Sequence, residues 1–181
     1  MILSDSELVE MLREPRTRRE GFAVLVKQYS EKLYWKVRRI VLSYEDANDV
    51  LQNVFIKVWS NLQNFQGKSS LSTWLYRIAI NESLDFLRKQ KLADNVSADE
   101  DVSVASRLMS DEYFDGDEVQ ARLQEAVARL PEVQRTVFNL KYFEEMKYSE
   151  ISQILNTSEG ALKASYHLAV KKITEYLHLF D

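Results

Sequence analysis

Residues 43–91 read SYEDANDVLQNVFIKVWSNLQNFQGKSSLSTWLYRIAINESLDFLRKQK, and this stretch decides the fold. Apolar residues recur every three or four positions from Val50 to Leu62, with polar residues on the positions between them. This spacing is typical of an amphipathic helix, because residues three and four apart share one helix face. A second helical pattern begins at Leu71, after a short polar loop that contains Phe65. We therefore predict two helices joined by a loop.

The pattern extends toward the N-terminus. Residues 4–13 predict a short helix, with Ser4 as its cap and Glu7 in the capping-box position. A longer apolar stripe then runs from Phe22 to Val41. Helices beginning near Phe22, Glu45 and Leu71 can share one core, with Ser43 as the cap of the middle one. We expect a domain of three or four helices over residues 1–91.

An acidic segment follows, over residues 92–118. It contains nine acidic residues and one basic residue, and it has no helical periodicity. The segment carries a charge of −8, so the remainder of the chain, whose total is −4, carries +4. Its Asp, Ser and Asn content predicts a flexible linker between two mildly basic halves.

Residues 119–181 predict a second helical domain. Val119, Leu123, Ala126, Val127 and Leu130 form one stripe, and Pro131 begins another helix with Val133 on its apolar side. Farther on, Ser149 and Ser158 are possible helix caps, and Asn156 is suited to a left-handed turn between them. A short helix, a tight turn and a longer helix make up a helix-turn-helix. The chain is thus expected to be all-α, with two small helical domains.

The composition excludes several classes of protein. There is no Cys and there are only two His, which argues against disulfides, metal sites and His-based catalysis. No Gly-rich phosphate loop and no nucleophile–base set is present, so we expect a non-enzyme without cofactor, metal or small-molecule substrate. No apolar run reaches the length of a membrane span, and no secretion signal begins the chain, so we expect a cytoplasmic protein without membrane insertion.

Two segments resemble a known family. DANDVLQNVFIKVW, followed by F-x-G-x-SSLSTWLYRIAIN-x-x-x-D-x-x-R, is similar to the second region of bacterial RNA polymerase sigma factors of the extracytoplasmic-function (ECF) group. LPEVQRTVFNLKYF through SEGALKASY resembles the fourth region of the same proteins. The resemblance implies a sigma factor that binds core RNA polymerase and directs it to promoter DNA, reading the −10 element with residues 1–91 and the −35 element with residues 119–181. It also implies an anti-sigma partner.

The resemblance assigns roles to particular residues. The polar arc of the first helix matches the motif that docks on core polymerase; it comprises Asp46, Asp49, Gln52, Asn53 and Lys57. The loop and the exposed side of the next helix match the surface that captures the melted −10 strand; the candidates are Phe65, Lys68, Ser69, Ser70, Arg77, Asn81 and Arg88. Without the resemblance, the polar arc of the first helix would be interpreted as a solvated face, and Trp74 and Phe86 of the next helix as core.

The last helix supplies the candidates for the −35 element, and they are Ser158, Gly160, Lys163, Ala164, His167 and Lys171. Small residues permit close approach to a groove, while cations reach phosphates or base edges. The chain departs from the commoner family pattern, because Lys163-Ala164-Ser165 stands where R-S-R is frequent. Arginine makes the bidentate guanine contact better than lysine does, which favours weak or shape-based reading there.

Two other interpretations stay open on the residues alone. A helix-turn-helix regulator would bind its operator without polymerase and with a steep salt dependence. A protein-binding helical adaptor would have lost DNA contact altogether, and the arginine-poor last helix is compatible with that.

Overall fold

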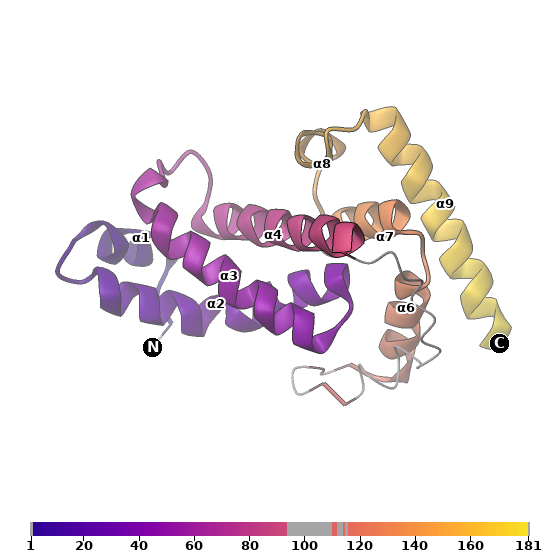
Figure 1. Cartoon of the computed structure of the whole chain (residues 1–181), viewed down its shortest axis with the longest axis horizontal. Coiled ribbons are helices and arrows are strands. Elements are labelled where there is room, and N and C mark those ends of the chain that lie inside the picture. Colours follow the sequence, from indigo (N-terminus) through magenta and orange to yellow (C-terminus); the bar gives the residue numbers. More distant parts are fainter. Residues whose placement is uncertain (1, 94–109, 112–113, 115, 181) are drawn as a thin grey trace. The chain divides into compact units, whose positions relative to one another are not determined.

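The structure, a computed structural model, describes residues 2–93, 110–111, 114 and 116–180 (Figure 1). Within these ranges all regular structure is helical, which confirms the predicted all-α class. The chain divides into two compact units, unit 1 (Met1–Val96) and unit 2 (Ser97–Asp181), and each is considered by itself. Most of the predicted linker 92–118 lies outside the described residues, but its first two residues belong to a helix that ends at Ala93, and its last residue, Glu118, begins another.

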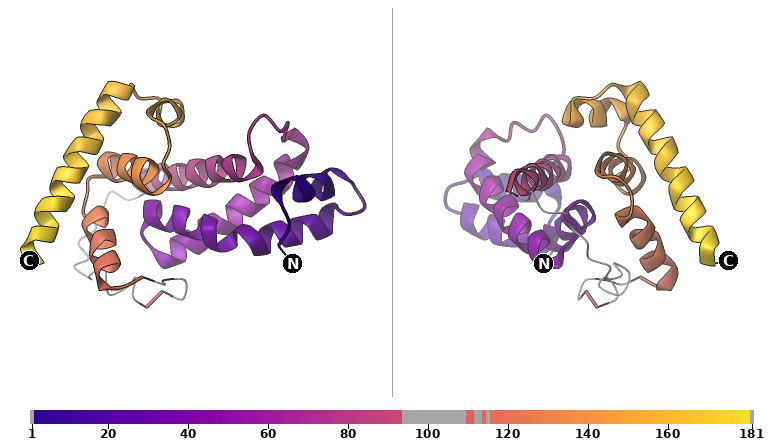
Figure 2. Two further views of the ribbon diagram at one scale, coloured as in Figure 1. Left: turned by 180° about the vertical axis from the view of Figure 1, so that it is seen from behind. Right: turned by 45° about the vertical axis from the view of Figure 1, so that its right-hand side comes forward.

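Over residues 2–93, unit 1 contains four α-helices and one 3₁₀ turn. They are α1 (Asp5–Arg13), α2 (Arg18–Val41), α3 (Tyr44–Asn61), η1 (Leu62–Asn64) and α4 (Leu71–Ala93). Helices α2, α3 and α4 pack against one another, and α1 lies on α2 (Figures 1 and 2). Leu25, Leu33, Val54 and Leu75 are buried at the centre. Helix α1 belongs to this core, because its Leu8 is completely buried.

Side-chain caps fix where the helices of unit 1 begin. The Ser4 hydroxyl accepts a hydrogen bond from the Glu7 backbone N–H, and the Glu7 carboxylate accepts one from the Ser4 N–H at 2.7 Å. The Ser43 hydroxyl likewise accepts the Asp46 N–H at 3.3 Å. Both predicted caps are confirmed. Helix α4 has a cap that was not predicted, since the Ser70 hydroxyl accepts the Thr73 N–H at 3.2 Å.

Unit 2 contains four α-helices, a π-helical turn and a final 3₁₀ turn in its described part. They are α6 (Glu118–Ala128), α7 (Glu132–Phe138), η2 (Asn139–Phe143), α8 (Tyr148–Leu155), α9 (Glu159–Leu177) and η3 (His178–Phe180). The long helix α9 runs along α6 and α7, as both views in Figure 2 show. Ala126, Leu130 and Phe138 pack against Ala169 and Ile173 of α9.

Three predictions for unit 2 are wrong. Val119 is 71% exposed. Ala121 and Glu125 of α6 face the core, and Val119, two positions before Ala121, therefore lies on the opposite side of the helix. Val133 of α7 is exposed as well. Ser149 does not cap α8, which begins one residue earlier; instead, the Glu150 carboxylate accepts the Lys147 N–H at 3.0 Å.

The turn before α9 is as predicted. Asn156 adopts a left-handed conformation, with φ 51° and ψ 47°, which ends α8. The Ser158 hydroxyl accepts the Ala161 N–H at 3.3 Å and begins α9. Helices α8 and α9 therefore form the predicted helix-turn-helix.

Candidate functional site

The first candidate surface is the outer side of α3. The helix turns Ala47, Val50, Val54 and Val58 into the core, so the polar positions between them face outward. Asp49, Gln52, Asn53 and Lys57 are exposed and Asp46 is half-buried, so these five candidates share one arc. The Lys57 ammonium forms an ion pair with Glu82 of α4, which ties this arc to the next helix.

An apolar residue lies within the polar arc and was not predicted as part of it. Ile56 is 63% exposed, and its position on the helix falls between those of Gln52 and Asp49. Trp59 of the same helix is 41% exposed, and its ring packs edge-on against that of Phe22, with ring centroids 5.0 Å apart. A partner that covered this surface would bury apolar area at its centre, surrounded by polar groups. Isolated apolar residues among polar ones were the signal for it in the sequence.

The second candidate surface is the loop from Phe65 to Ser70. Gly67 has a φ of +69°, a conformation that a side chain would strain. Lys68 and Ser70 are exposed and Ser69 is half-buried, but the Ser70 hydroxyl also caps α4. The Phe65 ring is half-buried, and it packs on the core beside Trp74 with ring centroids 5.1 Å apart. The loop therefore offers polar groups outward and only part of one aromatic face.

The third candidate set lies on α4. Arg77, Asn81 and Arg88 are all exposed, and their spacing places them on one stripe along the helix. Arg88 forms an ion pair with Asp85 at 2.7 Å. Asn81 makes no side-chain hydrogen bond to any residue that the structure describes, so its amide is open to a ligand. The stripe thus lies on α4, and the loop directly precedes the N-terminus of the same helix.

The fourth candidate surface is one side of α9. Ser158, Gly160, Lys163, Ala164, His167 and Lys171 are all exposed. A methyl group at Gly160 would meet nothing within 4 Å, so close approach is possible there. The Lys163 ammonium lies 5.7 Å from the centre of the Tyr148 ring, and Lys141 lies 5.0 Å from the same ring. Lys171 lies 3.9 Å from Glu175.

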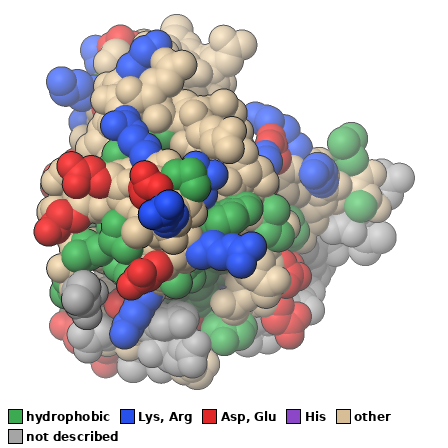
Figure 3. All heavy atoms as spheres, turned by 90° about the vertical axis from the view of Figure 1, so that its left-hand side faces the viewer, with side chains coloured by type: hydrophobic (Ala, Val, Ile, Leu, Met, Phe, Trp, Pro, Cys, Tyr) green, Lys and Arg blue, Asp and Glu red, His purple; other side chains and the backbone are tan. Residues whose placement is uncertain are grey.

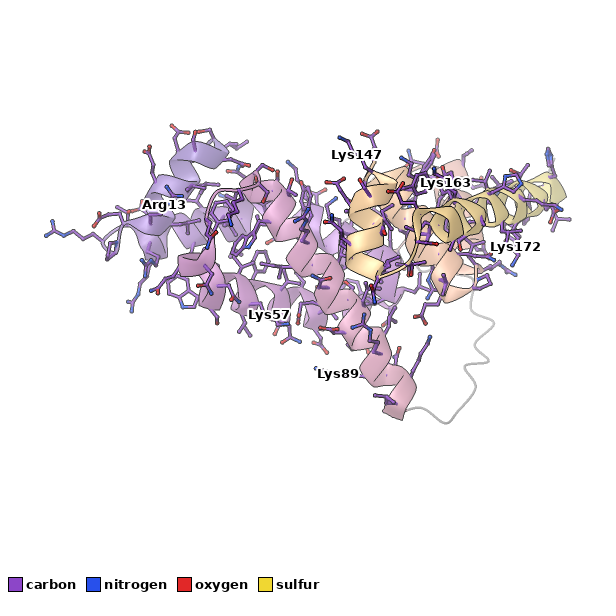
Figure 4. All side chains as sticks on the ribbon, turned by 90° about the horizontal axis from the view of Figure 1, so that it is seen from above. Arg13, Lys57, Lys89, Lys147, Lys163 and Lys172 are labelled. Atoms are coloured by element: carbon purple, nitrogen blue, oxygen red, sulfur yellow. The ribbon has the colours of Figure 1, made fainter. Side chains whose placement is uncertain are left out.

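Tyr148 connects the two helices of the helix-turn-helix. Its ring meets that of Tyr166 edge-on, with centroids 6.5 Å apart, and attracts both lysines through its face. Burial, followed by the charge of Tyr166, raises the pKa of Tyr148, so its hydroxyl stays neutral at physiological pH. Lys163 is therefore held near α8, as its place in Figure 4 agrees.

A further cation was missed. Arg13, at the end of α1, has a guanidinium nitrogen 3.5 Å from where a side chain on Gly67 would begin. It thus lies beside the Phe65–Ser70 loop, although 54 positions separate the two in sequence. No local pattern could have revealed that contact.

In the described part of the chain, no group of three or more acidic or His residues is arranged to hold a metal ion. Nor does any helix there combine the length and apolar character that crossing a membrane requires.

Sequence comparisons connect both units to known families. Residues 25–93 match the profile of Sigma-70 region 2, and residues 120–173 match that of Sigma-70, region 4. The chain is 33% identical over 157 residues to the ECF RNA polymerase sigma factor SigW of Bacillus subtilis, covering 82% of this chain and 84% of the relative. It is 30% identical over 176 residues to the ECF RNA polymerase sigma-E factor of Escherichia coli K12, covering 90% and 88%.

Solved structures with the same fold share little sequence. The sigma factor RpoE of Bartonella quintana, in complex with the anti-sigma factor NepR, aligns over 88% of this chain and 98% of its own, with a TM-score of 0.68 and 20% identity. CnrH, in complex with the cytosolic domain of CnrY, aligns over 98% and 96%, with a TM-score of 0.62 and 20% identity.

Proposed function

Since the chain belongs to the ECF group of RNA polymerase sigma factors, we propose that it binds core RNA polymerase and directs it to specific promoters. Residues 1–91 would dock on polymerase and read the −10 element, and residues 119–181 would read the −35 element. The role is one of binding rather than catalysis, and its place is the cytoplasm, where promoter DNA and polymerase are found.

The α3 surface suits polymerase docking. Asp46, Asp49, Gln52 and Asn53 offer carboxylates and amides to a basic, polar partner, which sets orientation more than affinity. Exposed Ile56 supplies apolar area at the centre of the same arc. Truncation of a residue at the centre of an interface commonly costs more binding energy than truncation of the groups around it.

The loop and α4 suit the capture of a melted strand. Unstacking a base and extruding it from a duplex costs a few kcal/mol, and contacts to the edge and face of that base can offset the cost. Asn81 has both a donor and an acceptor for a base edge, while Lys68, Arg77 and Arg88 can contact phosphates. Because Phe65 is half-buried, we assign to it one stacking face at most.

The α9 surface suits the major groove at the −35 element. Its first turns carry Gly160 and Ala164, which let the helix approach closely, and Lys163 and His167 are exposed beside them. Lysine contacts phosphates as a point charge, so we expect the grip here to depend on salt more than on base sequence.

An anti-sigma partner is also proposed. The support for it is that RpoE of Bartonella quintana, which has the same fold, was solved in complex with the anti-sigma factor NepR.

The observation that carries the proposal is that one chain matches both sigma regions and exposes the candidate polar side chains of each. The test is run-off transcription and promoter binding with the purified chain, core polymerase, or both. We expect promoter-dependent transcripts only with both components. Specific DNA binding by the chain alone would favour a free-standing regulator, and polymerase binding without promoter-dependent initiation would favour an adaptor.

A further inference from the structure

The turn between α1 and α2 is rich in arginine, and no role was assigned to it above. Residues 13–19 read REPRTRR, which places four arginines in seven positions. This turn precedes the segment that matches Sigma-70 region 2, since the match begins at residue 25. Its cations are therefore a feature of this chain that the family match does not account for.

The turn is held rigidly. The Arg18 guanidinium donates hydrogen bonds to the backbone carbonyls of Leu12 at 3.0 Å and Arg13 at 3.3 Å, and the Thr17 hydroxyl donates to that of Met11 at 2.9 Å. These bonds satisfy carbonyls at the end of α1 that have no partner within the helix. One arginine is thus used to build the turn, and the other three are left to face solvent.

Those three residues, Arg13, Arg16 and Arg19, are named here the arginine surface. All three are exposed, and none forms an ion pair with any residue in the described ranges. Glu14 lies between them in sequence, and Glu10 and Glu20 flank them, but none of these carboxylates forms an ion pair with the three arginines. Figure 3 faces this side of unit 1 and shows Lys and Arg side chains spread over it, with acidic side chains among them.

The arginine surface adjoins the loop that we assign to strand capture. Arg13 approaches Gly67, as described, and Figure 4 shows Arg13 at the end of unit 1 away from Lys89. Asp5, at the start of α1, joins this helix to α2 and α4, because its carboxylate accepts hydrogen bonds from the Tyr29 hydroxyl and from the Ser72 N–H in the first turn of α4. Helix α1 is thus fixed against α2 and α4, and Arg13 at its end lies beside the loop.

We propose that Arg13, Arg16 and Arg19 bind backbone phosphates of the melted promoter strand, and so extend its path from the Phe65–Ser70 loop across the α1–α2 turn. This inference rests on the proposed function. Guanidinium groups form bidentate hydrogen bonds with phosphates, and the hydrogen-bonded turn fixes the backbone from which the three side chains extend. Phosphates repeat along any strand, so the contacts carry no sequence preference and add affinity beside the bases that the loop reads.

The test uses holoenzyme assembled from the full chain and core polymerase, with a promoter fork whose melted strand is single-stranded. Binding is measured over a range of salt concentrations for the wild type, for Arg13→Gln/Arg16→Gln/Arg19→Gln, and for the corresponding triple Lys variant. We expect the Gln variant to lower the slope of log affinity against log salt by about 0.7 per lost single-strand contact, or roughly 2 in all. The Lys variant should keep most of the slope.

Two exposed lysines of α2 provide the matched control, since Lys27→Gln/Lys32→Gln also removes positive charge from unit 1. Per charge removed, it should change the slope much less than the arginine variant. A slope equal to that of the wild type, or an equal effect per charge in the control, would overturn the inference. So would a loss of affinity for core polymerase, which would show that the surface faces protein. A wild-type holoenzyme that forms no promoter complex would instead refute the proposed function itself.

Discussion

At the scale of single residues, α9 contains its own control for the proposed −35 contact. Lys163 and Lys172 are both exposed, and nine positions place them on opposite sides of the helix (Figure 4). We predict that Lys163→Ala lowers the salt slope of upstream promoter binding by holoenzyme by about 0.9, the effect of one phosphate contact with duplex DNA. Lys172→Ala should change it little. Equal slopes for the two variants would remove Lys163 from the interface.

Asn81 permits a second test of the same kind. Its side chain makes no hydrogen bond within the described part of the fold, so Asn81→Ala should leave the stability of unit 1 unchanged. We predict slower formation of the open complex, measured by the reactivity of unpaired thymines to permanganate, with unchanged affinity for core polymerase. Gln90→Ala, on the opposite side of α4, is the control. Weakened core binding in Asn81→Ala would contradict the assignment.

Lys36 is expected to make the stability of unit 1 depend on pH. Its ammonium lies 3.9 Å from the centre of the Tyr76 ring, and burial, helped by the charges of Arg39 and Lys32, lowers its pKa from 10.5 to about 8. Between these values the unfolded chain binds a proton that the folded chain does not, so the free energy of unfolding rises with pH. We predict such a rise from pH 8 to 9.5, and its loss in Lys36→Met.

The measurement is urea unfolding followed by tryptophan fluorescence. Trp35, Trp59 and Trp74 are the three tryptophans of the chain, and all lie in unit 1, so the signal reports that unit alone. A Lys36→Met protein that kept the full pH dependence would show that another group titrates.

At the scale of the helices, two glycines should respond to the same substitution with opposite signs. A methyl group at Gly21 would lie 2.8 Å from Cβ of Met11, because α1 and α2 pack very closely there. At Gly160 it would meet nothing within 4 Å. We predict that Gly21→Ala destabilises unit 1 by about 1–3 kcal/mol through overpacking. Gly160→Ala should stabilise unit 2 by about 0.4–1 kcal/mol.

Tryptophan fluorescence follows unfolding for the first variant, and far-UV circular dichroism, which sees both units, follows it for the second. If Gly21→Ala were as stable as the wild type, α1 would not pack on α2 as described.

The helices also show what could be predicted from sequence. Ser4, Ser43 and Ser158 were identified as caps, because a cap depends on residues within one turn. The prediction that Ser149 caps α8 was wrong, because the Glu150 carboxylate accepts a hydrogen bond from the Lys147 N–H instead. Two neighbouring starting points for α8 look alike in sequence. The π-helical turn at Asn139–Phe143 leaves no periodic signal at all.

For the candidate surfaces, the sequence likewise predicted what depends on local pattern and not what depends on contacts between distant segments. The residues of α3, α4 and α9 could be placed on faces, since a face follows from the helical period, and they are exposed or, at Asp46, half-buried. That Phe65 packs beside Trp74, and that Arg13 reaches the loop, depends on tertiary packing between distant segments. The roles of all these residues stay predictions.

At the scale of the whole molecule, the proposed function assigns the spacing between promoter elements to polymerase, which would hold both units at once. We predict that inserting six Gly/Ser residues after Ala98 leaves the preferred distance between −10 and −35 elements unchanged, because an already anchored unit needs no taut connection. Transcription from templates whose spacer varies one base pair at a time measures this. A shifted optimum would show that the segment between the units acts as the spacer.

The ion pair between Lys57 and Glu82 has a consequence for where RNA synthesis begins. It joins the proposed docking arc of α3 to α4 at the residue next to Asn81, and the two helices also share one packed core. Under the proposed function, the distance from polymerase to the captured base would then be constant, and unit 1 would set the position of the first template nucleotide in the catalytic centre. A substitution that breaks the ion pair would therefore spread the 5′ ends of the transcripts over neighbouring positions before it lowered the number of transcripts.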